Sequence, residues 1–356
     1  MSASQPPALV SARWLFENIS PSSSSSSSPP PPPPSSPSPP PPSPLGPALV
    51  VLDASWHVPG TGRDARQEFV HARVPGAAFF DLDESSDRQG TFGLHAMPTA
   101  AAFTLFARGL GVSARSHVVV YDRGSSDPTA ARAWWMFRAF GHSAVSLLDG
   151  GLEAWRAAGF PLEAGLPNAP AASGVRLTDG GDGGAGGGGA GDGDGAWLFH
   201  ATEPPPGQLK SFEEIRDNVS SKEFVLVDSR PEGRVTSSEP QLLPDFSSSH
   251  IPGSVSMPYS SVMDPHAGLM LGVDALRAEF ERRGVPLGRP FVATCISGVT
   301  ACMLLLAAHL CGAPDGALYD GSLLEWTARA PAEDVATGPG ARRSSAARAR
   351  RLSGGR

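Results

Sequence analysis

Cysteine is scarce in this chain: it occurs only three times in 356 residues. A small and odd number of cysteines argues against a disulfide framework and for free thiols in a reducing compartment. Long apolar runs are missing too, since no stretch reaches the roughly 18 residues that a membrane-spanning helix needs. The N-terminal segment also lacks the apolar core of a signal peptide. We therefore expect a soluble protein of the cytoplasm, the mitochondrion or both, with no membrane partner.

Positive charge is also limited. The chain has 28 Lys and Arg against 35 Asp and Glu, and its formal net charge is −7. Such a balance gives no electrostatic footprint for nucleic acid, so no nucleic-acid partner is expected. The exception is a group of arginines between Arg342 and Arg351, which belongs to a C-terminal stretch, 334–356, that we predict to be a disordered basic tail.

Two segments lack the side chains needed to build a core. From Pro21 to Pro42 the chain is almost entirely Ser and Pro, and from Gly180 to Gly195 it is almost entirely Gly, Asp and Ala. Neither composition can bury enough apolar surface to offset the entropy lost on ordering. We predict a disordered insert at 21–47 and a flexible linker at 167–208.

The remaining sequence repeats itself. "VVLDASW" around Asp53 corresponds to "FVLVDSR" around Asp228, and "HARVPGAAFF" corresponds to "HIPGSVSMPY". "VVVYD", ending at Asp122, corresponds to "FVATC", ending at Cys295, and "LLDGGLEAW" corresponds to "LYDGSLLEW". These motifs occur in the same order at nearly constant spacing, which indicates two copies of one structural unit.

Each copy predicts an α/β fold. It has the pattern strand, Pro-Gly loop, short strand, helix, strand, loop, helix, strand, helix, and its strands are short, apolar and β-branched. This alternation is typical of a parallel sheet with helices on both faces. We expect two tandem domains of this kind. Domain 1 comprises an N-terminal helix segment, 1–20, and residues 48–166, and domain 2 comprises residues 209–333.

The stretch "FVATCISGVTACMLLLAAHLCG" places Cys295 where an apolar strand ends and a helix is about to begin. In parallel sheets ligands bind at the carboxyl ends of the strands, where the first N–H groups of the next helix point at them. Those donors favour a thiolate, which is a nucleophile able to carry a transferred group as a persulfide. The alternative is that Cys295 is a small buried core residue.

The other two cysteines and the first copy provide internal comparisons. Cys302 and Cys311 fall on a helix that is apolar all round, so core packing is predicted for both, and His309 is predicted to be a core histidine. In the first copy the strand ends in Asp122 and the following loop is longer, so it cannot donate the same set of amides. We predict that domain 1 is catalytically silent.

The motifs "CISGVTAC", "DGSLLEW" and "HIPGS", together with the degenerate first copy, resemble the tandem-domain rhodanese sulfurtransferases. "AWWMFRAFGHSAVSLLDGGL" and Ser297 resemble the animal 3-mercaptopyruvate sulfurtransferase branch of that family. The resemblance implies an enzyme whose Cys295 takes sulfur from 3-mercaptopyruvate and releases pyruvate. The persulfide would then pass to a thiol such as thioredoxin or glutathione, or to cyanide. No metal or organic cofactor is implied.

The same resemblance implies roles for individual residues. Arg234 would bind the substrate carboxylate, for which a planar guanidinium is well suited. Asp64 would be the acidic member of a catalytic relay, and a neutral Ser297 would favour 3-mercaptopyruvate over dianionic thiosulfate. Arg230, by contrast, is expected to form a structural pair with Asp228. The persulfide cradle would consist of Cys295, Ile296, Ser297, Gly298, Val299 and Thr300.

Three positions depart from the family pattern. Ile296 stands where glycine is usual, Arg73 replaces the histidine of a "HIPG" motif, and Leu243 replaces a second substrate-binding arginine. Three hypotheses follow: a 3-mercaptopyruvate sulfurtransferase, a thiosulfate sulfurtransferase, or a rhodanese-fold interaction module with impaired catalysis. A cysteine-dependent phosphatase is disfavoured, because Ala301 stands where its phosphate-binding arginine would be required.

Overall fold

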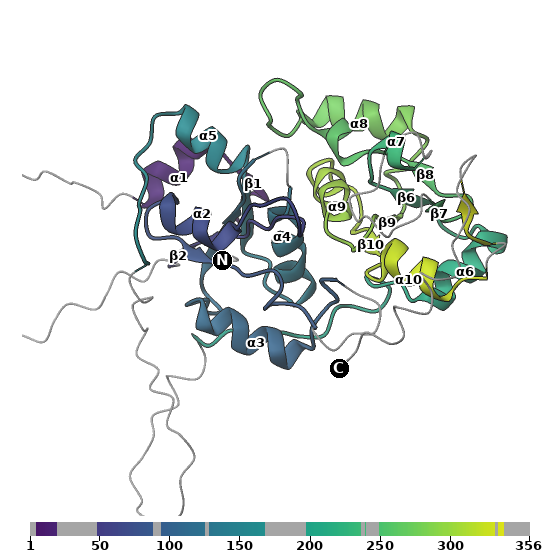
Figure 1. Ribbon diagram of the computed structural model, residues 1–356, viewed down its shortest axis with the longest axis horizontal. Helices are drawn as coiled ribbons and strands as arrows, with labels where there is room; N and C mark the ends of the chain where they lie inside the picture. The colour runs from purple at the N-terminus through teal and green to yellow at the C-terminus, as the bar shows by residue number, and fades with distance from the viewer. Residues whose placement is uncertain are drawn as a thin grey trace, which may run out of the picture.

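The computed structural model describes residues 5–19, 48–87, 94–124, 128–167, 197–235, 239, 249–331 and 334–337. Several predictions from the sequence fall outside the described residues. They concern the Ser/Pro insert, most of the Gly/Asp-rich linker, Leu243 and the arginines near the C-terminus. The described residues form two α/β units, which lie next to each other (Figure 1).

Domain 1, the N-terminal unit, is built on a five-stranded sheet in which every neighbouring pair of strands is parallel, in the order β1-β5-β4-β2-β3. The N-terminal segment adds an edge strand as well as the expected helix. The elements are β1 (Leu9–Val10), α1 (Ala12–Ile19), β2 (Leu49–Asp53), α2 (Ala65–His71), β3 (Ala78–Phe79), α3 (Ala100–Gly109), β4 (His117–Tyr121), α4 (Ala130–Ala139), β5 (Val145–Leu148) and α5 (Gly151–Ala157).

Domain 2 repeats this plan with a four-stranded parallel sheet in the order β10-β9-β6-β8, and it adds an antiparallel pair, β11-β7. Its elements are α6 (Phe212–Ser221), β6 (Leu226–Asp228), α7 (Glu232–Val235), β7 (Ser249–His250), β8 (Val255–Ser256), the 3-10 helix η2 (Tyr259–Val262), α8 (Val273–Arg282), β9 (Val292–Thr294), α9 (Ala301–Leu310), β10 (Ala317–Leu318), α10 (Ser322–Arg329) and β11 (Ala336–Thr337).

Strand β4 lies at the centre of the domain 1 sheet and is buried on both faces. All its residues are buried, and alternate side chains enter different clusters. Val118 and Val120 pack in the cluster that contains α3 and α4 residues, whereas Val119 and Tyr121 pack in the cluster that contains α1 and α5 residues. Since side chains alternate across a strand, an uninterrupted apolar strand needs helices on both faces. The prediction of two tandem α/β units with parallel sheets is confirmed.

The sequence did not predict a helix between the first two strands of either repeat. The expected loop between β2 and β3 contains the helix α2, and domain 2 has the shorter helix α7 at the corresponding place. The cause in domain 1 is local: Asp64 is the N-cap of α2, and its carboxylate accepts the N–H of Gln67 at 2.9 Å. Such a cap satisfies a donor that the first helical turn leaves unpaired.

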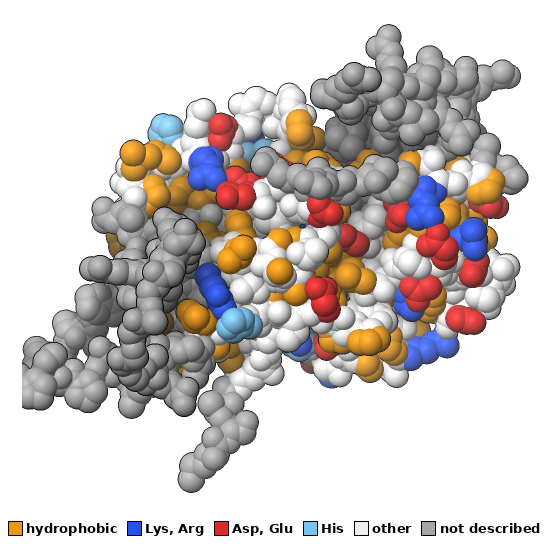
Figure 2. Space-filling model, turned by 90° about the horizontal axis from the view of Figure 1, so that it is seen from below, with side chains coloured by type: hydrophobic (Ala, Val, Ile, Leu, Met, Phe, Trp, Pro, Cys, Tyr) orange, Lys and Arg blue, Asp and Glu red, His pale blue; other side chains and the backbone are white. Residues whose placement is uncertain are grey.

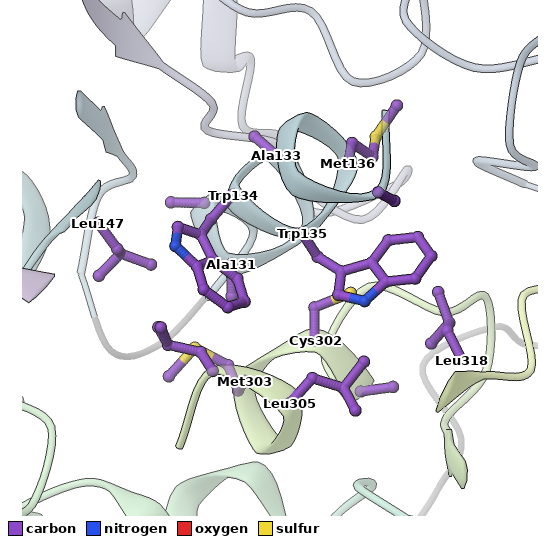
Figure 3. Close-up of a cluster of buried hydrophobic side chains, with 14 of the residues drawn as sticks. Ala131, Ala133, Trp134, Trp135, Met136, Leu147, Cys302, Met303, Leu305 and Leu318 are labelled. Atoms are coloured by element: carbon purple, nitrogen blue, oxygen red, sulfur yellow. The ribbon is translucent and has the colours of Figure 1, made fainter. Parts of the chain in front are cut away.

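The two domains share a core. Helices α4 and α9 pack against each other, and residues of both domains belong to one continuous apolar cluster. Figure 3 shows Trp134 and Trp135 of α4 directed towards Met303 and Leu305 of α9. The loop that precedes α9, which contains Cys295, is therefore held in a fixed relation to domain 1.

The surface agrees with the charge balance of the sequence. On the face drawn in Figure 2, basic and acidic side chains are interspersed and form no continuous basic area. Among the described residues, no helix has the length and apolar character that crossing a bilayer requires.

Candidate active site

Cys295 follows strand β9 directly, and the loop 295–300 leads from it into helix α9. The residue is 3% exposed. Its N–H donates to Ser322 Oγ at 3.3 Å, and its carbonyl accepts the N–H of Leu323 at 3.2 Å. The start of α10 thus fixes both ends of the residue that bears the thiol.

The loop after Cys295 turns sharply at Gly298, whose φ is +77°. No described residue accepts a hydrogen bond from the backbone N–H groups of residues 296–300. Successive unpaired N–H groups at the start of a helix attract negative charge, because the positive end of the helix dipole lies there. The electrostatic condition that the sequence predicted for a thiolate is therefore present in the backbone.

The thiol opens into a cavity of about 160 Å³, which both domains line. The lining is mainly apolar. Domain 1 supplies Trp56, Val58, Leu94, Pro128 and Thr129, and domain 2 supplies Arg230, Pro231, Arg234, Tyr259, Cys295, Ile296, Ser297, Val299 and Thr300. Cys295 therefore borders the cavity as well as the apolar core, and little of its surface is exposed.

Two hydroxyl groups beside Cys295 lie in this lining. Ser297 is 8% exposed, and its side chain has no hydrogen-bond partner among the described residues. Thr300 is held differently, because its Oγ1 lies 2.9 Å from Ser229 Oγ and shares a hydrogen bond with it. The Ser297 hydroxyl is therefore the one that a bound molecule can engage without breaking a protein contact.

Among the described residues, the lining contains two cations and no carboxylate. Arg230 is buried and paired with Asp228, at 2.6 Å between Nη2 and Oδ2, and it also donates to the carbonyl of Ser249 at 2.8 Å. The predicted structural pair is confirmed. Arg234 lies half-buried on α7 and lines the cavity, as a substrate-binding cation must. Leu243 lies outside the described residues.

Two positions singled out in the sequence lie away from the cavity. Asp64 does not line the cavity, and its carboxylate is committed to capping α2. Arg73 is fully buried inside domain 1, where it pairs with Glu163 and donates to the carbonyl of Gly165 at 2.6 Å. The segment of domain 1 that corresponds to "HIPG" therefore does not line the cavity. Arg73, which stands in that segment, does not change the cavity lining.

An acid–histidine pair that the sequence did not predict lies behind the cavity wall, although neither residue is part of the lining. His95 Nε2 lies 3.1 Å from Asp83 Oδ1, and Trp56 donates to both oxygens of the same carboxylate at 3.1 and 3.2 Å. Burial lowers the pKa of His95, so its imidazole is neutral near pH 7, and its Nδ1 has no hydrogen-bond partner among the described residues. The neighbouring Leu94 lines the cavity. A carboxylate shortly after the end of β3 was the signal available in the sequence.

Domain 1 has no equivalent cradle among its described residues. At the position of Cys295 it has Asp122, whose carboxylate accepts the N–H of Gly124 at 3.0 Å and that of Ala130 at 2.8 Å. Burial raises the pKa of Asp122 to about 7. The side chain itself occupies the start of α4, which supports the prediction that domain 1 does not take part in the chemical step.

The remaining cysteines are core residues, as predicted. Cys302 is fully buried and Cys311 is 7% exposed, and neither lines the cavity. Burial raises the pKa of Cys302 to about 12, so it stays a thiol at physiological pH. Within the described ranges, no three His, Cys, Asp or Glu side chains gather as they would around a metal ion.

Comparison with known proteins decides the family. The family model of the Rhodanese-like domain matches residues 62–158 and 211–329. The chain belongs to the rhodanese family. It is 42% identical to 3-mercaptopyruvate sulfurtransferase of Homo sapiens over 292 residues, which cover 82% of this chain and 89% of that protein. It is 39% identical to thiosulfate sulfurtransferase of Bos taurus over 330 residues, which cover 92% and 94%.

A solved rhodanese structure agrees with this assignment. The crystal structure of SseA from Escherichia coli, described as a 3-mercaptopyruvate sulfotransferase, superposes with a TM-score of 0.64 at 29% sequence identity. The alignment covers 89% of this chain and 99% of that chain. This rhodanese is therefore a sulfurtransferase of the 3-mercaptopyruvate and thiosulfate kind, and such an enzyme requires a sulfur donor and a thiol or cyanide acceptor.

Proposed function

We propose that this rhodanese takes sulfane sulfur from 3-mercaptopyruvate, holds it as a persulfide on Cys295 and passes it to a thiol such as thioredoxin or glutathione, or to cyanide. The observation that carries the proposal is one cysteine at a cavity, followed by backbone N–H groups that no described residue uses. We further propose a cytosolic or mitochondrial location, where three free cysteines stay reduced.

The chemical step is a sulfur transfer between two sulfur centres. The Cys295 thiolate attacks the sulfur of 3-mercaptopyruvate, a new S–S bond forms, and the donor's C–S bond breaks. The electron pair leaves on carbon as the enolate of pyruvate, which takes up a proton to give pyruvate. A thiolate acceptor then attacks the outer sulfur, becomes a persulfide itself and regenerates the Cys295 thiolate. The N–H groups of residues 296–300 stabilise the anionic sulfur in both stages.

The charge of the lining supports 3-mercaptopyruvate as donor. Arg230 is already paired with Asp228, and Ser297 adds no charge. Arg234 is the second cation of the lining, and we assign it to one carboxylate, which 3-mercaptopyruvate carries at its end away from the sulfur. Thiosulfate is a compact dianion and would need more positive charge close to Cys295. Asp83 and His95 lie behind this lining, where the Asp83 carboxylate accepts hydrogen bonds from Trp56, a residue of the cavity wall.

Two other functions compete. The thiosulfate reaction is favoured by the long match to the bovine enzyme, which extends over 92% of this chain. An interaction module with impaired catalysis is favoured by Ile296, a buried side chain that takes up part of the cavity wall beside the nucleophile. Both alternatives use the same fold, so only a measurement of sulfur transfer from each donor can distinguish them.

Intact-mass spectrometry after incubation with 3-mercaptopyruvate tests the proposal. Wild-type protein should gain one sulfur atom and release one pyruvate, and Cys295→Ser should gain none. Cys311→Ser is the matched control, because it removes another free cysteine that lies outside the cavity, and it should behave like the wild type.

The alternatives predict different outcomes of the same experiment. A faster gain of sulfur from thiosulfate than from 3-mercaptopyruvate would establish the thiosulfate reaction. No gain from either donor, with the protein folded, would leave the interaction module. Equal sulfur gain by the wild type and by Cys295→Ser would remove Cys295 from the mechanism altogether.

A further inference from the structure

We propose that Asp320 is a positioning residue for sulfur transfer: it ties the cavity wall supplied by domain 1 to the loop that carries Cys295. The inference rests on the proposed role of Cys295 as nucleophile. It gives the catalytically silent domain a task in the reaction, because a donor bound in the cavity contacts both domains at once.

The domain 1 wall depends on a short segment, residues 94–97. Leu94 lines the cavity, and the residues after it are held by Arg132 of domain 1 and Asp320 of domain 2. Asp320 Oδ2 accepts the N–H of Met97 at 2.7 Å. Asp320 Oδ1 accepts a hydrogen bond from Nη2 of Arg132 at 2.6 Å, and the same Nη2 donates to the carbonyl of His95 at 2.7 Å. One carboxylate and one guanidinium therefore hold this segment at two points.

The same ion pair supports the turn of the cradle. At Gly298 a Cβ atom would lie 3.2 Å from Arg132 Nη1, from Asp320 Oδ1 and from the Asp320 carbonyl oxygen. That separation is closer than ordinary van der Waals contact, so the turn lies directly against the pair. A shift of Asp320 or Arg132 would therefore be transmitted to the N–H groups on either side of Gly298.

Asp320 also begins the turn that anchors the nucleophile. Two residues later, Ser322 has a φ of +48°, and its hydroxyl donates to the carbonyl of Tyr319 at 2.7 Å. The same hydroxyl accepts the N–H of Cys295 at 3.3 Å. A non-glycine residue holds this backbone conformation only where its surroundings enforce it. Asp320 lies within this turn, and its carboxylate ties the turn to Met97 and Arg132 of domain 1.

Both oxygens of Asp320 are in use, which makes asparagine an informative replacement. The Asp320→Asn side chain would keep the shape but would have one acceptor oxygen, so either the Met97 N–H or Arg132 would face an NH₂ group. Arg132 is fully buried and Asp320 is 16% exposed at its side chain, so water replaces the lost acceptor poorly.

Asp320→Asn should lower kcat/KM for 3-mercaptopyruvate roughly tenfold or more, because misplacement of a reacting group by about 1 Å has effects of this order or larger. Alkylation of Cys295 by iodoacetamide is measured across pH as a second readout, and it needs no sulfur donor. The rate of alkylation should fall, since the displaced N–H groups would stabilise the thiolate less.

Domain 1 offers a closely matched control. Glu163 also uses both oxygens, one for the buried guanidinium of Arg73 and one for the N–H of Gly76 at 2.7 Å, but it lies away from the cavity. Glu163→Gln therefore makes the same chemical change in a purely structural setting. It should lower thermal stability as Asp320→Asn does, while kcat/KM and the alkylation profile stay within about twofold of the wild type.

A second variant keeps the test decisive if Asp320→Asn folds poorly. Arg132→Lys retains the charge but cannot reach both Asp320 and the His95 carbonyl with the geometry of a guanidinium, so it should show the same effects in weaker form. If folded Asp320→Asn or Arg132→Lys matches Glu163→Gln in both readouts, Asp320 has a structural role only. If wild-type Cys295 reacts with iodoacetamide but never gains sulfur, the proposed function fails, while the positioning role is still decided by alkylation.

Discussion

At the scale of single residues, Gly298 determines the shape of the cradle. We predict that Gly298→Ala loses about 1–3 kcal/mol of stability, because alanine disfavours a φ of +77° and its Cβ would press on Arg132 and Asp320. Sulfur gain at Cys295 should slow in parallel. Urea unfolding and mass spectrometry measure the two effects.

Gly253→Ala is the matched control for that prediction. Gly253 has nearly the same backbone angle, φ +79°, but no atom lies within 4 Å of the place its Cβ would occupy. It should therefore incur the backbone cost alone and keep normal sulfur transfer. An equally active Gly298→Ala protein would contradict the account of the cradle given above.

Ile296 directly follows the proposed nucleophile. It is 8% exposed, packs in the core of domain 2 and lines the cavity. Ile296→Ala should cost about 2–5 kcal/mol of stability, as buried isoleucine truncations do. It should also widen the cavity, so kcat/KM for 3-mercaptopyruvate should rise at a temperature where the variant is folded. Ile296→Val, which keeps the β-branch, should change both quantities little, and an unchanged rate in Ile296→Ala would show that the side chain does not restrict access.

Sequence reasoning placed correctly the residues whose position follows from a local pattern. Cys295 at a strand end and Arg230 beside Asp228 were both recognisable, because a strand–turn–helix pattern and an i, i+2 pair can be read along the chain. His95 and Asp83 were missed, since their pairing joins two irregular segments. Asp320 and Arg132 were missed because they meet only across the domain interface.

At the scale of secondary structure elements, Asp64 tests the difference between a helix cap and a catalytic acid. Asp64→Ala should lower stability by about 1 kcal/mol, the usual cost of removing an N-cap, because the N–H of Gln67 loses its acceptor. Sulfur transfer from 3-mercaptopyruvate should be unchanged. Asp83→Asn is the contrast: it weakens the hydrogen bonds that hold Trp56 in the cavity wall and should slow the reaction. A large loss of activity in Asp64→Ala would instead support the predicted role of Asp64 as the acidic member of a catalytic relay.

The elements themselves show how far pattern reasoning extends. Apolar strands such as β4 and an apolar helix such as α9 were predictable, because an element with so few polar side chains must be buried on all sides. Helix α2 was not, since it is short and its apolar content is low, and a single capping carboxylate helps to decide between helix and loop. The strand β1 was missed for a related reason: a two-residue edge strand exists only by pairing with β5.

At the scale of the whole molecule, the two domains form one core while only one of them carries the proposed nucleophile. The packing of α4 on α9 joins them, and the cavity lies where both contribute side chains. A duplicated unit that has lost its own nucleophile can still be retained if it completes the partner's site. The composition of the cavity lining, with Trp56 and Leu94 from domain 1, is consistent with such a division of tasks.

The silent domain should also impose a pH dependence on the stability of the whole protein. Burial raises the pKa of Asp122 from its ordinary value of 3.8 to about 7, so the folded state binds this proton more tightly than the unfolded state does. The stabilising contribution of the neutral form is complete below about pH 4 and is lost as the pH rises through about 7, which gives a falling stability in that window. Asp122→Asn has no such proton to lose, so urea unfolding at several pH values should show a flatter curve for the variant than for the wild type. Identical slopes for the two proteins would mean that Asp122 is already ionised in the folded domain, held in that form by the N–H groups of Gly124 and Ala130.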